Sequence, residues 1–464
     1  MSIVIHSTTV VTADPDRSVH HGAAIAVEGD RIAAIGPSDQ VLARFPDAER
    51  IDGRGKAVMP GFANCHTHFV LTLARGIFED LSHANTPPFH GLVRLPLPEL
   101  APEERVVIAQ LGALEALRSG TTAVMEVAQG IGVYAQALVD TGLRLVLAEQ
   151  ASDRAHGGIG QPGVFEVDPK RTEDGLQRIA DLHATWNGAN GGRVTVAVAA
   201  HAPDMVSPEL LRGLRDLQER LDTISTIHLS QLWGEVESVK ANRGVLPTDY
   251  LAQNGFLHQR LVAAHCRCME PPEVLLLGES GAFMCFNSAI AARRGLSPRV
   301  ADLERAGCTI AMGSDNMAED MVEVMRTGMF MERVRTNDGR APTPEDVLQW
   351  ATANGYRALG LEGAGCLQEG NKADLIVVRT QLAHLVPTMR IVSSFVHQGQ
   401  GRDIEAVMVD GRWLLRNGKV LTMDEERIVR EAERIGRAAW RRLFEEHPDL
   451  EVPPGLDTTE PPTE

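Results

Sequence analysis

Short hydrophobic runs alternate with helical patterns through the middle of the chain. Eight almost continuously apolar runs are candidate strands: 58–64, 121–126, 143–149, 194–201, 223–228, 261–265, 282–286 and 309–315. Helical patterns such as 102–119, 208–221 and 322–335 separate them. Strands without polar alternation are typical of a parallel sheet covered on both faces. Eight such units predict a (β/α)8 TIM barrel, with its chemistry at the carboxyl ends of the strands. An open doubly wound sheet is the alternative, but no glycine-rich phosphate loop follows the first strand.

The two ends of the chain have a different pattern. Short alternating segments occur at 2–11, 23–28, 31–36 and 48–52, and again at 373–378, 404–409 and 412–416. Asp410-Gly411 is a hairpin-turn signal between the last two of these segments. We expect both ends to build one small β-sandwich. The predicted division is 1–57 and 372–422 for the sandwich, 58–371 for the barrel, and 423–464 for a C-terminal helix with a flexible tail.

Composition and charge disfavour two classes of protein, those that bind nucleic acid and those that lie in or on a membrane. The 464 residues are 44% hydrophobic and 23% charged, with a net charge of −17. An acidic chain is a poor partner for nucleic acid or an anionic membrane. No apolar run reaches the roughly 18 residues of a membrane helix, and the first residues do not resemble a signal peptide. We therefore expect a cytoplasmic protein, with its six scattered cysteines reduced, that acts on a small molecule.

Ionisable residues gather where the candidate strands end. They are His66 and His68 after the first strand, His201, His228 and His265 after the fourth to sixth, and Asp315 after the eighth. Residues two apart on a strand face the same way, so His66 and His68 can reach one ion. Any one of these histidines alone would more often be a core residue, and Asp315 alone could cap a helix. Together they predict a site for Zn²⁺, Fe²⁺ or Mn²⁺ with an open position for water.

These motifs resemble those of a known family. The residues that carry the resemblance are Pro60-Gly61-Phe62-Ala63-Asn64-Cys65-His66-Thr67-His68, Ser119-Gly120-Thr121-Thr122, Ala200-His201-Ala202-Pro203, His228-Leu229-Ser230-Gln231, Ala264-His265-Cys266 and Gly313-Ser314-Asp315. The chain resembles the amidohydrolase superfamily, in the branch of cytosine, guanine and adenosylhomocysteine-type deaminases and triazine chlorohydrolases. The resemblance covers roughly residues 1–420 and implies a barrel with a flanking sandwich and one catalytic metal.

Carried over by position, the resemblance gives each residue a role. The metal ligands would be His66, His68, His228 and Asp315, and His265 would contact the metal-bound water or the substrate. His201 would line the substrate pocket. Zinc is the expected metal, with iron or manganese as alternatives, and relatives in the branch suggest a homo-oligomer, a dimer or a tetramer. Chemically, Asp315 can accept a proton from the water, and His265 can donate to the atom on which charge develops.

Two positions depart from the branch pattern. Gln231 stands where the branch usually has glutamate, and Ser288-Ala289 stands where it usually has Ser-Asn. Glu235, one helical turn beyond Gln231, is interpreted as a surface or helix-dipole residue. Glu126 closes the second strand and is a candidate for substrate binding, together with His201 and Gln231, although a satisfied carboxylate at the rim is the alternative. The proline-rich segment 74–100 is expected to shape access to the pocket.

The favoured function is metal-dependent hydrolysis of a carbon–nitrogen bond in a small amide-, urea- or carbamate-like substrate through a metal-bound hydroxide. The phenylurea and molinate hydrolases of the branch are of this kind. The first alternative is deamination or dechlorination of a purine, pyrimidine or triazine ring. The second is a catalytically silent binding scaffold, which the presence of all four expected ligands disfavours.

Overall fold

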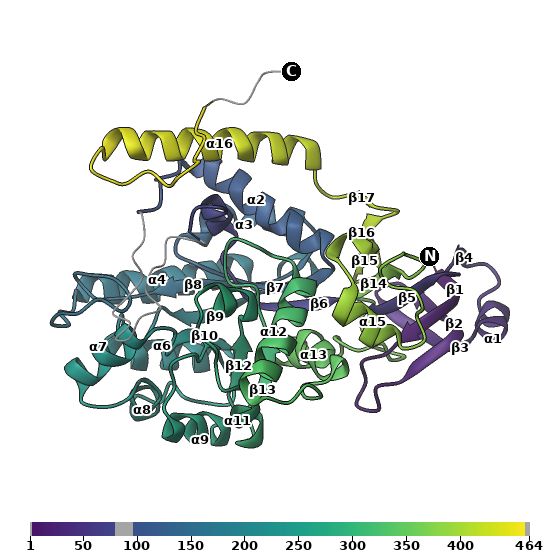
Figure 1. Cartoon of the computed structure of the whole chain (residues 1–464), viewed down its shortest axis with the longest axis horizontal. Helices are drawn as coiled ribbons and strands as arrows, with labels where there is room; N and C mark the ends of the chain where they lie inside the picture. The colour runs from purple at the N-terminus through teal and green to yellow at the C-terminus, as the bar shows by residue number, and fades with distance from the viewer. Residues whose placement is uncertain (1, 79–95, 460–464) are drawn as a thin grey trace.

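The computed structural model describes residues 2–78 and 96–459 and contains two separate sheets. An eight-stranded sheet forms the centre of the molecule, and a nine-stranded sheet lies to one side of it (Figure 1). No helix among the described residues is long and apolar enough to cross a membrane. The eight-stranded sheet has the number of strands that the hydrophobic runs of the sequence predict.

The central sheet is a TIM barrel of parallel strands. Its strands, in their spatial order, are β6 (Phe62–Thr67), β7 (Thr121–Ala128), β8 (Arg144–Ala151), β9 (Val194–Ala200), β10 (Ser225–Leu229), β11 (Leu261–His265), β12 (Phe283–Phe286) and β13 (Thr309–Met312). The last strand returns to the first through a parallel bridge between Thr67 and Asp315. This bridge nearly closes the barrel at the point where the candidate ligands lie. The predicted barrel is confirmed.

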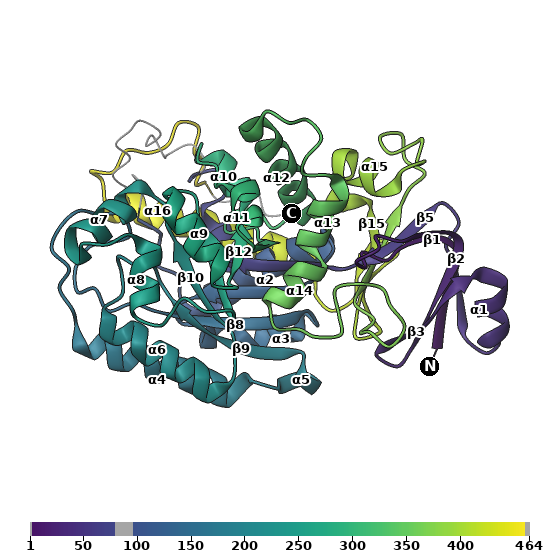
Figure 2. The same cartoon turned by 90° about the horizontal axis from the view of Figure 1, so that it is seen from below.

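Helices cover the outside of the barrel, as Figure 2 shows from below. The longer ones are α2 (Pro102–Arg118), α4 (Pro169–Trp186), α6 (Pro208–Leu221), α7 (Trp233–Arg243), α9 (Pro271–Glu279), α12 (Met321–Thr336) and α13 (Pro344–Ala351). Short helices complete the ring: α3 (Ala135–Asp140), α5 (Ala189–Gly192), α8 (Pro247–Gln253), α10 (Ser288–Arg293), α11 (Val300–Arg305) and α14 (Ala353–Ala358). The C-terminal helix α16 (Glu425–Glu446) packs on α2, and Trp440 Nε1 donates to the Leu73 carbonyl at 2.8 Å.

Both chain ends build the second sheet. Its N-terminal strands are β1 (Ser2–Val11), β2 (Val19–Glu28), β3 (Arg31–Pro37), β4 (Glu49–Asp52) and β5 (Lys56–Pro60), accompanied by the helix α1 (Ser38–Arg44). Its C-terminal strands are β14 (Leu375–Arg379), β15 (Ile404–Val409), β16 (Arg412–Arg416) and β17 (Lys419–Val420), with α15 (Ile391–Gln398) between β14 and β15. All of these strands except β4 hydrogen-bond in one continuous path rather than as two separate sheets, and β4 pairs with β1 beside that path. Residues from both chain ends share one apolar core.

The predicted strand at 58–64 is in fact two strands in two different sheets. Lys56–Pro60 pairs with β14 in the second sheet, whereas Phe62–Thr67 starts the barrel. The chain crosses between the sheets at Gly61, where an added Cβ would lie 2.1 Å from the Thr122 hydroxyl oxygen. Only glycine allows such a close approach. Hydrophobic periodicity alone cannot reveal this change of sheet, because both halves are buried.

Small side chains fill the interior of the barrel. Ala63 and Cys65 of β6, Ala123 of β7, and Ala197 and Ala199 of β9 belong to one buried cluster. A layered packed interior is characteristic of this fold and leaves the chemistry to the strand ends. Tyr356 from α14 belongs to the same cluster, and its hydroxyl donates to Asp374 Oδ2 at 3.0 Å.

A buried ion pair joins the barrel to the second sheet. Arg144 of β8 donates to both carboxylate oxygens of Asp374, at 2.8 and 3.0 Å, and to Asp410 at 2.7 Å. The Asp374 side chain is fully buried, and its backbone carbonyl accepts the amide hydrogen of Gly61. Asp374 therefore binds both the Gly61 amide, where the chain crosses between the sheets, and Arg144 of the barrel strand β8.

We predict that Asp374→Ala lowers the free energy of unfolding by about 3 kcal/mol or more, because it leaves the Arg144 guanidinium buried with one partner fewer. Asp338→Ala is the matched control, since the Arg340–Asp338 pair has an arginine side chain that is 92% exposed. This control should change stability by less than about 1 kcal/mol. Denaturant unfolding of the two variants measures the difference, and equal losses would contradict the prediction.

Candidate metal centre

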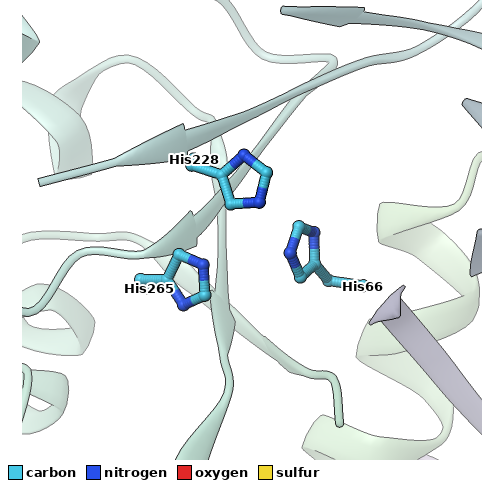
Figure 3. A group of neighbouring side chains, drawn as sticks. All are labelled: His66, His228 and His265. Atoms are coloured by element: carbon cyan, nitrogen blue, oxygen red, sulfur yellow. The ribbon is translucent and has the colours of Figure 1, made fainter. Parts of the chain in front are cut away.

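The strand ends bring four imidazoles and one carboxylate into contact. The His66 ring lies 4.7 Å from that of His228 and 5.2 Å from that of His265, centroid to centroid. Figure 3 shows these three rings facing one another from strands β6, β10 and β11. Nitrogen atoms of His66, His228 and His265 form one candidate metal-binding group, and donor atoms of His66, His68 and Asp315 form a second. In each group the donor atoms all lie within 4.8 Å of one another.

The tautomers of His68 and His228 follow from their hydrogen bonds. The Nδ1 atom of His68 contacts the Val127 carbonyl, and Nδ1 of His228 lies 2.6 Å from the His201 carbonyl. A carbonyl oxygen only accepts, so each Nδ1 carries the hydrogen and each neutral ring leaves a lone pair on Nε2. Those two Nε2 atoms lie 3.3 Å apart. Two lone pairs at this distance repel each other unless a cation lies between them.

The spacing fits a metal ion. Two nitrogens bound tetrahedrally at about 2.0–2.1 Å lie roughly 3.3–3.4 Å apart. Asp315 Oδ1 lies 3.5 Å from His68 Nε2, and Asp315 Oδ2 lies 3.8 Å from His265 Nδ1. The carbonyl contacts of the two Nδ1 atoms are the outer hydrogen bonds that orient metal-binding histidines. The donor set and its geometry therefore fit a divalent metal.

His66 and His265 are buried without hydrogen bonds. Neither ring nitrogen of either residue has a hydrogen-bond partner among the described residues. Burial, together with neighbouring imidazoles and Arg267, holds the pKa of both histidines well below its ordinary value. Both rings are therefore neutral near pH 7 and keep a lone pair available to a metal or a substrate. Buried polar atoms without partners are rare in proteins and point to a missing ligand.

Asp315 is held by a strained backbone. Its φ is 73°, in the left-handed region that side chains other than glycine rarely adopt. Its amide donates to the His66 carbonyl at 2.9 Å, and its own carbonyl accepts from His68 at the same distance. An added Cβ at Gly313 would meet the His66 backbone at 2.9 Å, so the chain passes close to β6 only with glycine there. His265 has a φ of 77°, so two central residues share this strain.

A cavity of about 300 Å³ opens beside these residues. The three predicted substrate-binding residues, Glu126, His201 and Gln231, line it, and so does Gln150. Glu126 is fully buried, and its carboxylate accepts from the Phe69 amide at 2.9 Å and from the Tyr134 hydroxyl at 2.8 Å. Burial raises the pKa of Glu126 to about 8. Glu126 therefore lies in the wall with both oxygens occupied, which agrees with the satisfied-carboxylate interpretation.

The interpretation of Glu235 as a surface residue is wrong. Glu235 is fully buried, and its carboxylate accepts from the backbone amides of Ser230 and Gln231 at 2.7 and 2.8 Å. Burial, and next the charge of Asp204, raise the pKa of Glu235 well above its ordinary value. It is absent from the residues that line the cavity, whereas Gln231 lines it with a buried amide nitrogen that has no partner among the described residues. Glu235 thus positions Gln231 and does not replace the missing glutamate.

Sequence reasoning missed other residues of the site. Glu319 is buried beneath the site and accepts from Thr67 Oγ1 at 2.8 Å and from Asn64 Nδ2 at 3.2 Å. The next residue, Asp320, caps α12. Arg267 lines the cavity and follows His265 by two residues. The signal in the sequence that could have identified Arg267 is its position just after the end of an apolar strand. Of the segment 74–100, residues 79–95 lie outside the described residues, so its role at the pocket entrance stays a prediction.

Comparison with known proteins agrees with this geometry. The amidohydrolase family model matches residues 57–414, and a bacterial imidazolonepropionase-like composite domain matches residues 23–48. The chain belongs to the amidohydrolase family. It is therefore a hydrolytic enzyme that acts on carbon–nitrogen bonds and uses a divalent metal.

Individual relatives extend over nearly the whole chain. A 5-methylthioadenosine/S-adenosylhomocysteine deaminase of Pelotomaculum thermopropionicum is 31% identical over 93% of this chain and 98% of its own length. A 5'-deoxyadenosine deaminase of Methanosarcina barkeri is 30% identical over 95% of this chain and 99% of its own length. An adenosine deaminase of Xanthomonas campestris, solved with bound zinc, superposes with a TM-score of 0.82 at 25% identity, covering 96% of this chain and 98% of that chain. A triazine hydrolase of Arthobacter aurescens shares the fold, with a TM-score of 0.82 at 20% identity. The match covers 94% of this chain and 99% of that chain.

We predict that the purified protein carries about one transition-metal ion per chain and that His66→Ala removes most of it. His66 is central because its ring contacts those of His68, His228 and His265. His20→Ala, at an exposed position on β2, is the control and should keep the metal. Elemental analysis of the three proteins measures the metal content. Full metal content in His66→Ala would remove His66 from the ligands.

Proposed function

We propose that the protein hydrolyses the carbon–nitrogen bond of a small amide-, urea- or carbamate-like substrate at a single zinc ion. His66, His68, His228 and Asp315 are the proposed ligands, and the observation that carries the proposal is the pair of Nε2 atoms 3.3 Å apart on His68 and His228. Zinc suits nitrogen and carboxylate donors, and a zinc-bound relative supports this choice of metal. The metal, when bound, lowers the pKa of a water molecule so that it can attack near neutral pH.

The residues around the metal have separate roles in the proposed reaction. Asp315 accepts the proton of the attacking water and passes it to the leaving nitrogen. His265, with an Nδ1 atom 3.8 Å from Asp315 Oδ2, donates a hydrogen bond to the oxygen on which charge develops. His201 lines the cavity and orients the substrate. A cytoplasmic homo-oligomer stays part of the proposal and is tested by light scattering and fractionation.

Gln231 decides between this reaction and ring deamination. Attack on a ring carbon moves electrons onto a ring nitrogen, which then needs a proton. Gln231 offers the cavity an amide nitrogen with no partner among the described residues, and an amide donates a hydrogen bond without releasing a proton near pH 7. A carbonyl substrate needs only hydrogen bonds and the metal for its oxyanion. The buried Glu235 does not line the cavity, so it does not supply the missing acid.

Deamination of an adenine nucleoside is the second candidate. The observation that favours it is the similarity to relatives described as deaminases of 5-methylthioadenosine, S-adenosylhomocysteine and 5'-deoxyadenosine, over more than nine-tenths of the chain. In that case another group must deliver the proton to the ring. The two candidates share the metal, Asp315 and the barrel, and they differ in the chemistry required of Gln231.

We predict that Asp315→Asn lowers kcat by roughly 10²- to 10⁴-fold, because an amide of the same shape cannot accept the proton. Metal content is measured in the same preparation, so that loss of the ion and loss of the proton acceptor are distinguished. Activity close to that of the wild type would exclude Asp315 as the base.

We predict that the wild type cleaves at least one amide, urea or carbamate and that its kcat/KM for the three aminated nucleosides is lower by 100-fold or more. Gln231→Glu should raise deamination, because the carboxyl group can exchange a proton with the ring. Gln253→Glu, at an exposed position at the end of α8, is the control for the added charge and should leave both activities unchanged. Rapid deamination by the wild type would establish the second candidate instead.

A further inference from the structure

Among the described residues, three arginines line the cavity of this protein, whose net charge is −17. Arg105 extends from α2, Arg267 follows β11, and Arg294 follows α10. The acids in the described part of the wall are Glu126 and Asp315. Asp315 is a proposed metal ligand, and the Glu126 carboxylate is occupied by Phe69 and Tyr134. Neither acid is therefore a dedicated partner for a guanidinium group.

Arg267 is the most unusual of the three. It is 8% exposed, and its Nε and Nη1 atoms are buried with no hydrogen-bond partner among the described residues. No carboxylate of that part of the chain lies within ion-pair distance of it. Arg144, which is also buried, shows the usual arrangement, since it is bound by two aspartates at 2.7–3.0 Å. A buried charge without a partner costs several kcal/mol, so its retention here calls for a specific reason.

A bound metal increases this cost. Arg267 lies two residues from His265, and the charges that act on it include that of Asp315. When Asp315 binds a divalent cation, its negative charge is shared with the metal, and the surroundings of Arg267 become more positive. A transient oxyanion would neutralise Arg267 only during the reaction. An anionic group on the substrate would neutralise it throughout the bound state, and the arginine fork matches a carboxylate in geometry.

We propose that Arg267 binds a carboxylate of the substrate, so that the enzyme selects anionic over neutral molecules of the same reactive class. This proposal rests on the proposed function for the reactive group, but not for the anion. The cavity of about 300 Å³ accommodates a small ligand in which the carboxylate and the scissile bond lie a few bonds apart. Arg267 is thereby a specificity-determining residue that is distinct from the metal ligands.

The test compares matched substrates that differ only in charge. Each N-carbamoyl amino acid is paired with its neutral carboxamide, which keeps the same reactive group and nearly the same size. The variants are Arg267→Met and Arg267→Lys. Arg260→Met is the control, because Arg260 precedes the same strand at its other end, where it pairs with Asp222 at 2.6 Å on the surface.

We expect Arg267→Met to lower kcat/KM for the carboxylate member of the cleaved pair by about 100-fold, mainly through KM, and to change the neutral member by less than about threefold. Arg267→Lys should recover part of the loss, because it keeps the charge without the fork. Arg260→Met should behave as the wild type. A saturating carboxylate compound should raise the Tm of the wild type but not that of Arg267→Met.

Stability separates this role from a structural one. If Arg267 serves the substrate, Arg267→Met without ligand keeps or raises the Tm, because a buried unpaired charge is removed. A lower Tm would make Arg267 a structural partner of Asp315 and overturn the proposal. Equal losses for both members of a pair would also overturn it. If no member of these pairs is cleaved, the proposed amide reaction fails, and the carboxylate proposal is then decided by whether the carboxylate compound raises the Tm of the wild type and not that of Arg267→Met.

Discussion

The arrangement of the site depends on two lone pairs that face each other. Because carbonyl oxygens hold the hydrogens on Nδ1 of His68 and of His228, both Nε2 atoms of the neutral rings are acceptors, and they lie 3.3 Å apart. The fold places His66 and His265 beside them, and the ring nitrogens of both have no hydrogen-bond partner among the described residues. Only a cation relieves all of these contacts at once, so the barrel is built to be completed by a metal.

The rest of the barrel keeps this arrangement in place. Glycine at 313 lets the last strand reach the first, and the strained backbone of Asp315 then aims its carboxylate at His68. Glu235 fixes the loop that carries Gln231 through two backbone hydrogen bonds. At the opposite end of the barrel strands, Arg144 and Asp374 hold the second sheet against the barrel. Strain near the metal is therefore supported by well-satisfied polar groups elsewhere.

The sequence predicted what depends on local pattern. Apolar runs gave the eight barrel strands, and the position of a histidine or an aspartate at the end of a run identified the residues that meet at the site. Features that depend on three-dimensional approach were not predictable. The change of sheet at Gly61 depends on the closeness of Thr122, and the burial of Glu235 depends on two amides of a loop. Arg267 was overlooked because a charged residue after a strand is usually solvated, whereas here the cavity wall encloses it.

The most direct test of the metal centre is anomalous diffraction at the zinc absorption edge from crystals of the protein grown with zinc. The account predicts one strong peak per chain, about 2.0–2.2 Å from Nε2 of His68, from Nε2 of His228 and from a carboxylate oxygen of Asp315. A map with no peak between His68 and His228, or with zinc bound only at another place in the chain, would contradict it.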